Sequence, residues 1–132
     1  MNKSLSTDQK FYEILAVDDD SLILSILEMS CKPFDLRVNI NTASNIHSAI
    51  NMCQRKKYDL LFLDHELEGV KGWELLDYLK PNLSKVVKVL VYSSSVDSQS
   101  VIEYRIRNVQ DILKKPLTPP AIGFAIRKAL QI

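Results

Sequence analysis

The chain alternates between short apolar runs and longer segments in which apolar residues recur every three or four positions. The clearest run is Leu60-Leu61-Phe62-Leu63, which is followed directly by Asp64. A short run that is apolar at every position predicts a strand buried on both faces, as in a parallel sheet. Because ligands bind outside the carboxyl ends of such strands, Asp64 is a candidate site residue from its position alone.

Five strand-like runs alternate with five helix-like segments. The predicted strands cover residues 12–17, 36–40, 59–63, 86–92 and 110–114. The predicted helices cover residues 21–32, 45–57, 72–79, 96–107 (or 97–107) and 119–130. This alternation predicts an α/β fold in which helices cover both faces of a five-stranded parallel sheet. We expect residues 11–132 to form one domain and residues 1–10, which are mostly polar, to form a flexible N-terminal tail.

Composition and charge exclude several classes of protein. The chain is 46% hydrophobic and 25% charged, as is usual for a soluble globular protein. Its net charge of +1 gives no general attraction to nucleic acid or membrane, so neither is expected as a partner. The sequence contains no long apolar span or signal peptide, and we expect a cytoplasmic protein. Cys31 and Cys53 lack metal-ligand spacing and are predicted to be buried free thiols.

Polar side chains follow four of the predicted strands. Asp18 and Asp19 follow the first strand, Asp64 the third, Ser93 the fourth and Lys115 the fifth. Carboxylates crowded at one sheet edge repel unless a cation lies among them, and an oxygen-only ligand set favours Mg²⁺. A lysine and a hydroxyl at the same edge suit the binding of a phosphoryl group, and a carboxylate can act as the nucleophile. The pattern therefore indicates phosphoryl transfer onto an aspartate.

Each of these residues also has an ordinary explanation when it is taken alone. An aspartate after a strand is usually a turn or helix-cap residue, and Asp20 is predicted to cap the first helix. A serine run is usually only a loop, and a Lys-Pro pair after a strand is usually only a turn. The functional interpretation gains weight because all four strand ends carry compatible chemistry at once.

Over residues 12–132 this arrangement resembles the response-regulator receiver domains of two-component signalling. The resemblance implies a flavodoxin-like (βα)5 fold with strand order 2-1-3-4-5. It implies that Asp64 is the phosphoacceptor and that Mg²⁺ is the cofactor. Asp19 would bind the ion directly, Asp18 mainly through water, and Glu66 through its backbone carbonyl. Such a domain would phosphorylate and dephosphorylate itself and would not be a turnover enzyme.

The resemblance also assigns roles in switching. Ser93 would contact the phosphoryl group through its hydroxyl, Ser94 would be the small residue that leaves room for it, and Lys115 would pair with a phosphoryl oxygen. The Lys115–Pro116 peptide bond would be cis. Glu66 and Ser95, each two residues beyond a site residue, would flank the path of the hydrolytic water and tune the lifetime of the acyl phosphate. For Glu66 the ordinary alternative is an exposed loop acid without this role.

Two departures from the family pattern affect these expectations. Leu67-Glu68 and Lys71-Gly72 stand where the family usually has Met-Pro and Asp-Gly, and the retained glycine should preserve the helix entry. Ile112 occupies the place of the usual switch aromatic. We therefore expect the surface formed by the fourth helix, fifth strand and fifth helix to respond through packing and not through a swinging ring.

The implied partners are a histidine kinase or histidine phosphotransfer protein that donates the phosphoryl group, and a downstream protein target. Leu22, Leu24 and Met29 lie outside the core stripe of the first helix and form a candidate surface for the donor. A slightly rotated helix that buries one of them is the ordinary alternative. His65 is expected to be a solvent-facing loop residue.

Two other functions remain open at this level. A pseudo-receiver would bind partners without phosphorylation, for which Ile112 and the altered loop leave room. A haloacid-dehalogenase-type phosphatase would use Asp18 as nucleophile, but it needs a further acid after Lys115, and residues 116–132 contain none. Both a stand-alone receiver and a part of a longer regulator are compatible with the sequence.

Overall fold

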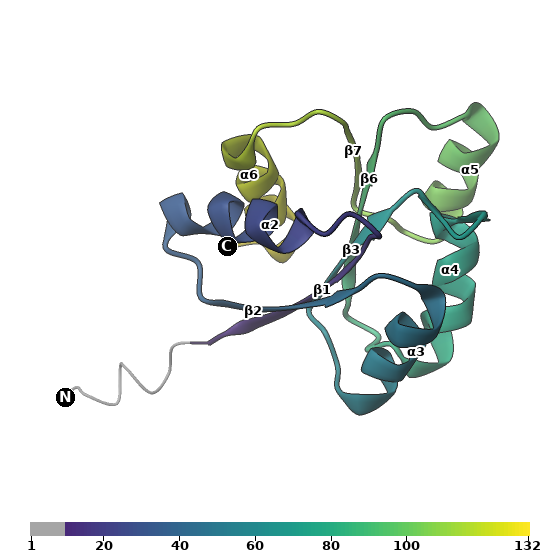
Figure 1. Cartoon of the computed structure of the whole chain (residues 1–132), viewed down its shortest axis with the longest axis horizontal. Helices are drawn as coiled ribbons and strands as arrows, with labels where there is room; N and C mark the ends of the chain where they lie inside the picture. Colours follow the sequence, from purple (N-terminus) through teal and green to yellow (C-terminus); the bar gives the residue numbers. More distant parts are fainter. Residues whose placement is uncertain (1–9) are drawn as a thin grey trace.

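The computed structural model describes residues 10–132, so the predicted tail lies outside the described residues except for Lys10. Five parallel strands form the central sheet in the order β2-β1-β3-β6-β7 (Figure 1). This is the predicted order 2-1-3-4-5 of a flavodoxin-like fold, which is confirmed. The strands are β1 (Tyr12–Val17), β2 (Val38–Ala43), β3 (Leu60–Asp64), β6 (Lys88–Ser93) and β7 (Asp111–Lys114).

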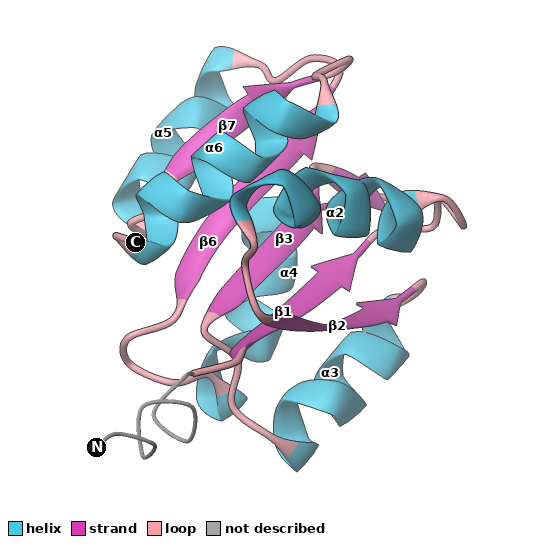
Figure 2. Cartoon of the chain, turned by 90° about the vertical axis from the view of Figure 1, so that its left-hand side faces the viewer, coloured by secondary structure: helices cyan, strands magenta, loops and turns pink. Residues whose placement is uncertain are grey.

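Helices cover both faces of the sheet, as the alternating pattern predicted. One face carries α2 and α6, and the opposite face carries α3, α4 and α5 (Figures 1 and 2). Short 3-10 turns extend α2 and α4, and each has a proline at its second residue. The helices are α2 (Ile23–Cys31), α3 (Ile46–Arg55), α4 (Gly72–Leu79), α5 (Ser98–Ile106) and α6 (Pro119–Leu130), and the turns are η1 (Lys32–Phe34) and η2 (Lys80–Asn82).

The central strand β3 explains why its sequence is apolar at every position. Successive side chains in a strand point to opposite faces. Leu60 and Phe62 pack in the core beneath α2 and α6, whereas Leu61 and Leu63 pack in the core beneath α3, α4 and α5. All four side chains are fully buried. Asp64 therefore lies at the carboxyl-terminal end of a central strand that is held in position by the cores on both faces of the sheet.

Side-chain caps set where three of the helices begin. Asn45 accepts a hydrogen bond from the Ser48 N–H at 2.8 Å, which begins α3, and Asp97 accepts from the Ser100 N–H at 2.7 Å, which begins α5. Thr118 caps α6 just before Pro119. Asp20, predicted as the cap of the first helix, instead accepts from the Leu22 N–H at 2.9 Å in the turn before α2.

Two strands begin two residues later than predicted, whereas β3 and β7 begin only one residue later. The strand expected over residues 36–40 is β2, which begins at Val38 because the parallel register with β1 pairs Val38 with Tyr12. The strand expected over residues 86–92 is β6, which begins at Lys88. Val86 is 73% exposed and belongs to the preceding turn, which the Val87 N–H closes on the Ser84 carbonyl.

The segment after β3 is an antiparallel hairpin, which the sequence pattern did not predict. Its strands are β4 (Glu66–Leu67) and β5 (Val70–Lys71). Glu68 (φ 54°) and Gly69 (φ 75°) form the tip with left-handed backbone, a conformation that suits a two-residue hairpin turn. The hairpin places the residues that follow Asp64 beside the predicted site.

Candidate phosphoacceptor site

Three carboxylates meet at the carboxyl edge of β1 and β3. Oxygen atoms of Asp18, Asp19 and Asp64 lie within 4.8 Å of one another. Asp18 is buried and Asp19 is exposed. Burial raises the pKa of the Asp18 carboxyl to about 6, and the negative charge of Asp64 also raises it. This set of hard oxygen ligands fits Mg²⁺, whose charge would offset the repulsion among the three groups.

Lys115 brings a positive charge to the same cluster. Its Nζ atom lies 3.7 Å from Oδ1 of Asp64, whose side chain is 15% exposed. The Lys115 N–H donates a hydrogen bond to the Ser93 carbonyl at 2.7 Å, which ties the residue after β7 to the end of β6. The Lys115–Pro116 peptide bond is cis, the isomer that the resemblance implies.

The hydroxyl of Ser93 is engaged within its own loop. Ser93 is buried, and its Oγ donates to the Ser95 carbonyl at 2.7 Å and accepts from the Ser95 N–H at 3.2 Å. Ser94 and Ser95 are exposed beside it. Ile112 lies half-buried in β7 and packs against the core beneath α3, α4 and α5.

The β4–β5 hairpin begins at Glu66, two residues after Asp64. The Glu66 N–H donates to Oδ1 of Asp64 at 3.4 Å, and the Glu66 side chain pairs with Lys71 at 3.1 Å across the hairpin. At the tip, Glu68 accepts a hydrogen bond from the Ile46 N–H at 2.7 Å. The hairpin is thus anchored to the first turn of α3. The only local signal for it was the Glu68-Gly69 pair.

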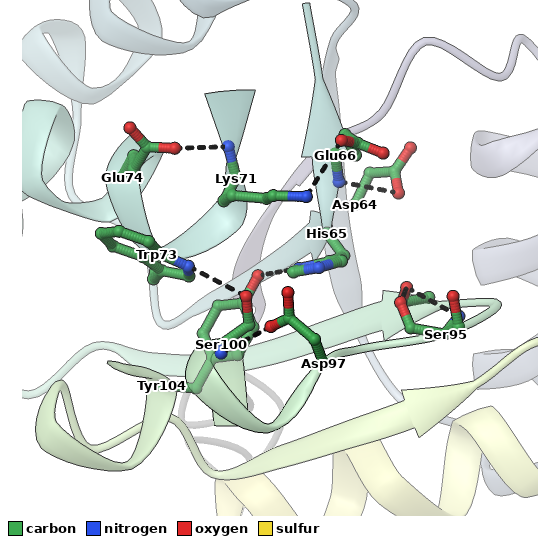
Figure 3. A network of polar contacts seen from close by, with 11 residues as sticks. Asp64, His65, Glu66, Lys71, Trp73, Glu74, Ser95, Asp97, Ser100 and Tyr104 are labelled. Atoms are coloured by element: carbon green, nitrogen blue, oxygen red, sulfur yellow. Dashed lines mark hydrogen bonds and ion pairs between the residues drawn. The ribbon is translucent and has the colours of Figure 1, made fainter. Parts of the chain in front are cut away.

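His65 is buried and not solvent-facing, so the prediction for this residue was wrong. It is 5% exposed, and its Nδ1 lies 2.5 Å from the hydroxyl of Tyr104 on α5 (Figure 3). Burial lowers the pKa of His65 below its ordinary value. Tyr104 is 1% exposed, and burial raises its pKa, so the hydroxyl keeps its proton. The expectation failed because α5 covers the start of the loop, which local sequence does not reveal.

The three apolar residues proposed as a donor surface are all solvent-accessible. Leu22, Leu24 and Met29 are 62%, 37% and 59% exposed. The alternative of a rotated helix that buries one of them is therefore excluded. Within residues 10–132, no helix is both long and apolar enough to span a membrane. Cys31 and Cys53 are buried and unpaired, as predicted.

Comparison with known proteins identifies the family. Residues 14–127 match the model of the response regulator receiver domain. The sensory transduction protein LytT of Bacillus subtilis is 30% identical over 115 residues, which cover 87% of this chain and 46% of LytT. The alginate biosynthesis transcriptional regulatory protein AlgB of Pseudomonas aeruginosa is 30% identical over 127 residues, 96% of this chain and 28% of AlgB. The chain thus spans less than half the length of either relative.

Solved structures agree on the fold. A response regulator from Thermotoga maritima superposes with a TM-score of 0.79 at 21% identity, covering 93% of this chain and 100% of that one. A two-component response regulator from Clostridium difficile superposes with a TM-score of 0.77 at 23% identity, covering 91% and 96%. The chain belongs to the response regulator receiver domain family, and the fold and its signalling class follow from that membership.

Proposed function

We propose that residues 11–132 form a receiver domain that accepts a phosphoryl group on the carboxylate of Asp64 in a Mg²⁺-dependent phosphorelay. The observation that carries the proposal is the convergence of the Asp18, Asp19 and Asp64 carboxylates with Lys115, 3.7 Å from Asp64. No single strand end would justify it. The ends of β1, β3 and β7 together supply a nucleophile, a metal-ligand set and a counter-charge at the carboxyl-terminal edge of the sheet.

In the proposed reaction an Asp64 oxygen attacks the phosphorus of a phosphohistidine on a partner protein. A P–O bond forms as the P–N bond breaks, and the histidine leaves with the bonding electron pair. Asp19, Asp64 and the Glu66 carbonyl would hold Mg²⁺ directly, and Asp18 would hold it mainly through water. When bound, the ion supplies positive charge that stabilises the phosphoryl oxygens.

Lys115 and Ser93 complete the binding of the phosphoryl group. The Lys115 ammonium neutralises charge on a phosphoryl oxygen beside Asp64. The Ser93 hydroxyl now donates to the Ser95 carbonyl, so it must leave that bond to donate to the new phosphoryl oxygen. Ser94 would leave room for the group. Phosphorylation therefore changes the loop between β6 and α5, which favours one of two conformations.

The proposed donor is a histidine kinase or a histidine phosphotransfer protein in the cytoplasm. The exposed apolar side chains of Leu22, Leu24 and Met29 lie on or just before α2, whose first turn follows the Asp18–Asp20 acids. An apolar surface beside the acceptor suits a helical partner that presents its phosphohistidine there. Glu66 and Ser95 are proposed to tune the lifetime of the acyl phosphate, and a downstream protein would recognise the phosphorylated form.

Intact mass spectrometry with acetyl phosphate as a small donor tests this function. Wild type should gain one phosphoryl group only when Mg²⁺ is present, and Asp64→Asn should gain none. Asp59→Asn is a matched control because Asp59 lies at the opposite end of β3, and it should behave as wild type. A folded wild type that gains no adduct from acetyl phosphate or from phosphohistidine partners would contradict the proposal and favour a pseudo-receiver that binds without phosphorylation.

A further inference from the structure

His65 and Tyr104 form a buried polar contact beside the phosphoacceptor. The hydroxyl of Tyr104 lies 2.5 Å from Nδ1 of His65, and both side chains are almost fully buried (Figure 3). The rings meet at a steep angle of 62° with their centroids 5.5 Å apart. Forming a buried hydrogen bond contributes little net stability, because both groups give up hydrogen bonds to water. Removing one partner costs more, because the other is left buried without a hydrogen bond. Movement of either residue away from the other therefore breaks this contact.

The backbone of His65 is held by residues of the site and by two hydrogen bonds. Its neighbours are Asp64, the proposed phosphoacceptor, and Glu66, whose carbonyl is a proposed Mg²⁺ ligand. The His65 N–H donates to the Tyr92 carbonyl at 3.4 Å, and its carbonyl accepts from the Gly72 N–H at 2.6 Å. Any adjustment of the backbone between the two ligand residues therefore moves the imidazole.

Gly72 is what allows Tyr104 to reach this position. A Cβ atom at Gly72 would lie 2.5 Å from the Tyr104 hydroxyl and 3.1 Å from the Asp64 carbonyl. The first residue of α4 therefore has no side chain at the point where the Tyr104 phenol passes it. The absence of a side chain here brings α5 into direct contact with the residue that follows the phosphoacceptor.

We propose that the hydrogen bond between His65 and Tyr104 transmits phosphorylation of Asp64 to α5, with both residues acting as positioning residues. This inference rests on the proposed function. Asp64 ends β3 and His65 follows it directly, with its imidazole against Tyr104 of α5. Ligation of Asp64 and Glu66 orients the backbone between them, and the imidazole carries that change to the middle of α5 through Tyr104.

The hydrogen bond between His65 and Tyr104 connects the site to α5 through polar groups, which Ile112 cannot do. The side chain of Ile112 packs in the core beneath α3, α4 and α5 and has no hydrogen-bonding group. Tyr104 instead joins α5 to the acceptor strand, while the Ser93–Asp97 loop joins the start of α5 to the end of β6. α5 is thus connected to the site at its first turn and again at Tyr104.

The single tryptophan of the chain lies where it can report on this link. Trp73 Nε1 donates to Ser100 Oγ at 3.2 Å, and Ser100 lies one turn before Tyr104 on α5. The Arg107 guanidinium also lies over the Trp73 ring, 4.9 Å from its centroid. Movement of α5 relative to α4 changes both contacts, so Trp73 emission is a built-in probe.

The experiment measures phosphoryl uptake and Trp73 emission in the same samples, after addition of acetyl phosphate and Mg²⁺. Tyr104→Phe keeps the ring and removes the hydroxyl, and His65→Leu removes the imidazole that contacts it. His65→Asn keeps an amide near the position of Nδ1, which can donate or accept a hydrogen bond, and is the rescue variant. Tyr78→Phe is the matched control, because Tyr78 is 58% exposed on α4. Circular dichroism verifies that each variant is folded.

Wild type, Tyr78→Phe and His65→Asn should change emission as they take up the phosphoryl group. Tyr104→Phe and His65→Leu should take it up to the same stoichiometry, but their emission change should be at most about a fifth of the wild-type change, because the variants lose the contact that couples Asp64 to α5. Hydrogen exchange of α5 amides should show the same loss. Two results would overturn the proposed coupling and leave the proposed function intact. One is an emission change in both variants as large as in wild type at equal stoichiometry, and the other is no emission change in phosphorylated wild type. Failure of wild type to take up phosphoryl would overturn the proposed function and this inference with it.

Discussion

Lys115 reaches Asp64 by passing over the ring of Tyr92. Its ammonium lies 5.0 Å from the centroid of the Tyr92 ring and 3.7 Å from Oδ1 of Asp64. The sheet order explains the path, because β6 lies between β3 and β7 and Tyr92 is the register partner of Asp64. The cation is therefore supported on an aromatic face and aimed at the carboxylate before any phosphoryl group arrives.

This arrangement predicts a strong effect of removing the charge of Lys115. Lys115→Met keeps most of the side-chain length but cannot neutralise a phosphoryl oxygen. Phosphoryl uptake from acetyl phosphate, followed by intact mass against time, should slow by about 100-fold, the usual cost of losing one preorganised group that stabilises developing charge. Lys114→Met, at the exposed neighbouring position, should keep the wild-type rate. Equal rates in the two variants would exclude the proposed role of Lys115.

The acidic cluster predicts which aspartate controls metal affinity. Asp19→Asn should weaken Mg²⁺ binding by about 10-fold or more, because it removes a charged ligand from a site with few others. Asp20→Asn is the matched control. Asp20 accepts a hydrogen bond from Leu22 N–H and is not in the cluster, so its amide can replace that acceptor. Isothermal titration with Mg²⁺ measures both affinities, and an unchanged value in Asp19→Asn would contradict the assignment.

The exposed apolar surface predicts a defect that is specific to protein donors. Changing Leu22 and Met29 together to serine should slow transfer from a phosphorylated histidine phosphotransfer protein by about 10-fold, since each side chain contributes buried apolar area to docking. Transfer from acetyl phosphate should not change, because neither side chain is part of the acceptor site. The comparison uses radiolabelled phosphoryl transfer for the protein donor and mass spectrometry for the small one. A parallel loss with both donors would indicate general damage to the site.

The close approach at Gly72 predicts a local steric cost. Gly72→Ala should lower the free energy of unfolding by about 1–3 kcal/mol, because the new methyl group meets the Tyr104 hydroxyl and the Asp64 carbonyl. Gly69→Ala meets no atom within 4 Å, but its positive φ should cost about 1 kcal/mol. Urea unfolding followed by circular dichroism gives both values. A Gly72→Ala protein as stable as wild type would mean that α4 and α5 separate easily.

The sequence predicted the parts of the fold that local patterns encode. Gly72–Leu79 and Pro119–Leu130 were predicted with the bounds that the structure has, because a glycine or a proline marks an end of each. The ends of other elements depend on partners that are distant in sequence. Val38 begins β2 because it pairs with Tyr12, and Lys88 begins β6 because it pairs with Leu60. Neither contact is visible in a sliding pattern of apolar residues.

The candidate site was partly predictable for the same reason. Residues at the carboxyl ends of parallel strands must share an edge, so Asp18, Asp64 and Lys115 could be placed together from sequence. His65 could not be placed correctly, because its burial depends on contact with Tyr104 of α5. That contact is possible only because Gly72 has no side chain. The hairpin after Asp64 was missed because its strands have only two residues each.

Chemical mapping of the phosphorylated residue tests the central claim most directly. An acyl phosphate on aspartate is reduced by borohydride to homoserine, which remains in the peptide after proteolysis and is located by tandem mass spectrometry. Protein treated with Mg²⁺ and acetyl phosphate, then reduced, should carry homoserine at position 64 and retain aspartate at positions 18 and 19. Homoserine at position 18 with aspartate at position 64 would contradict the account and would instead favour a phosphatase-like nucleophile at the end of β1.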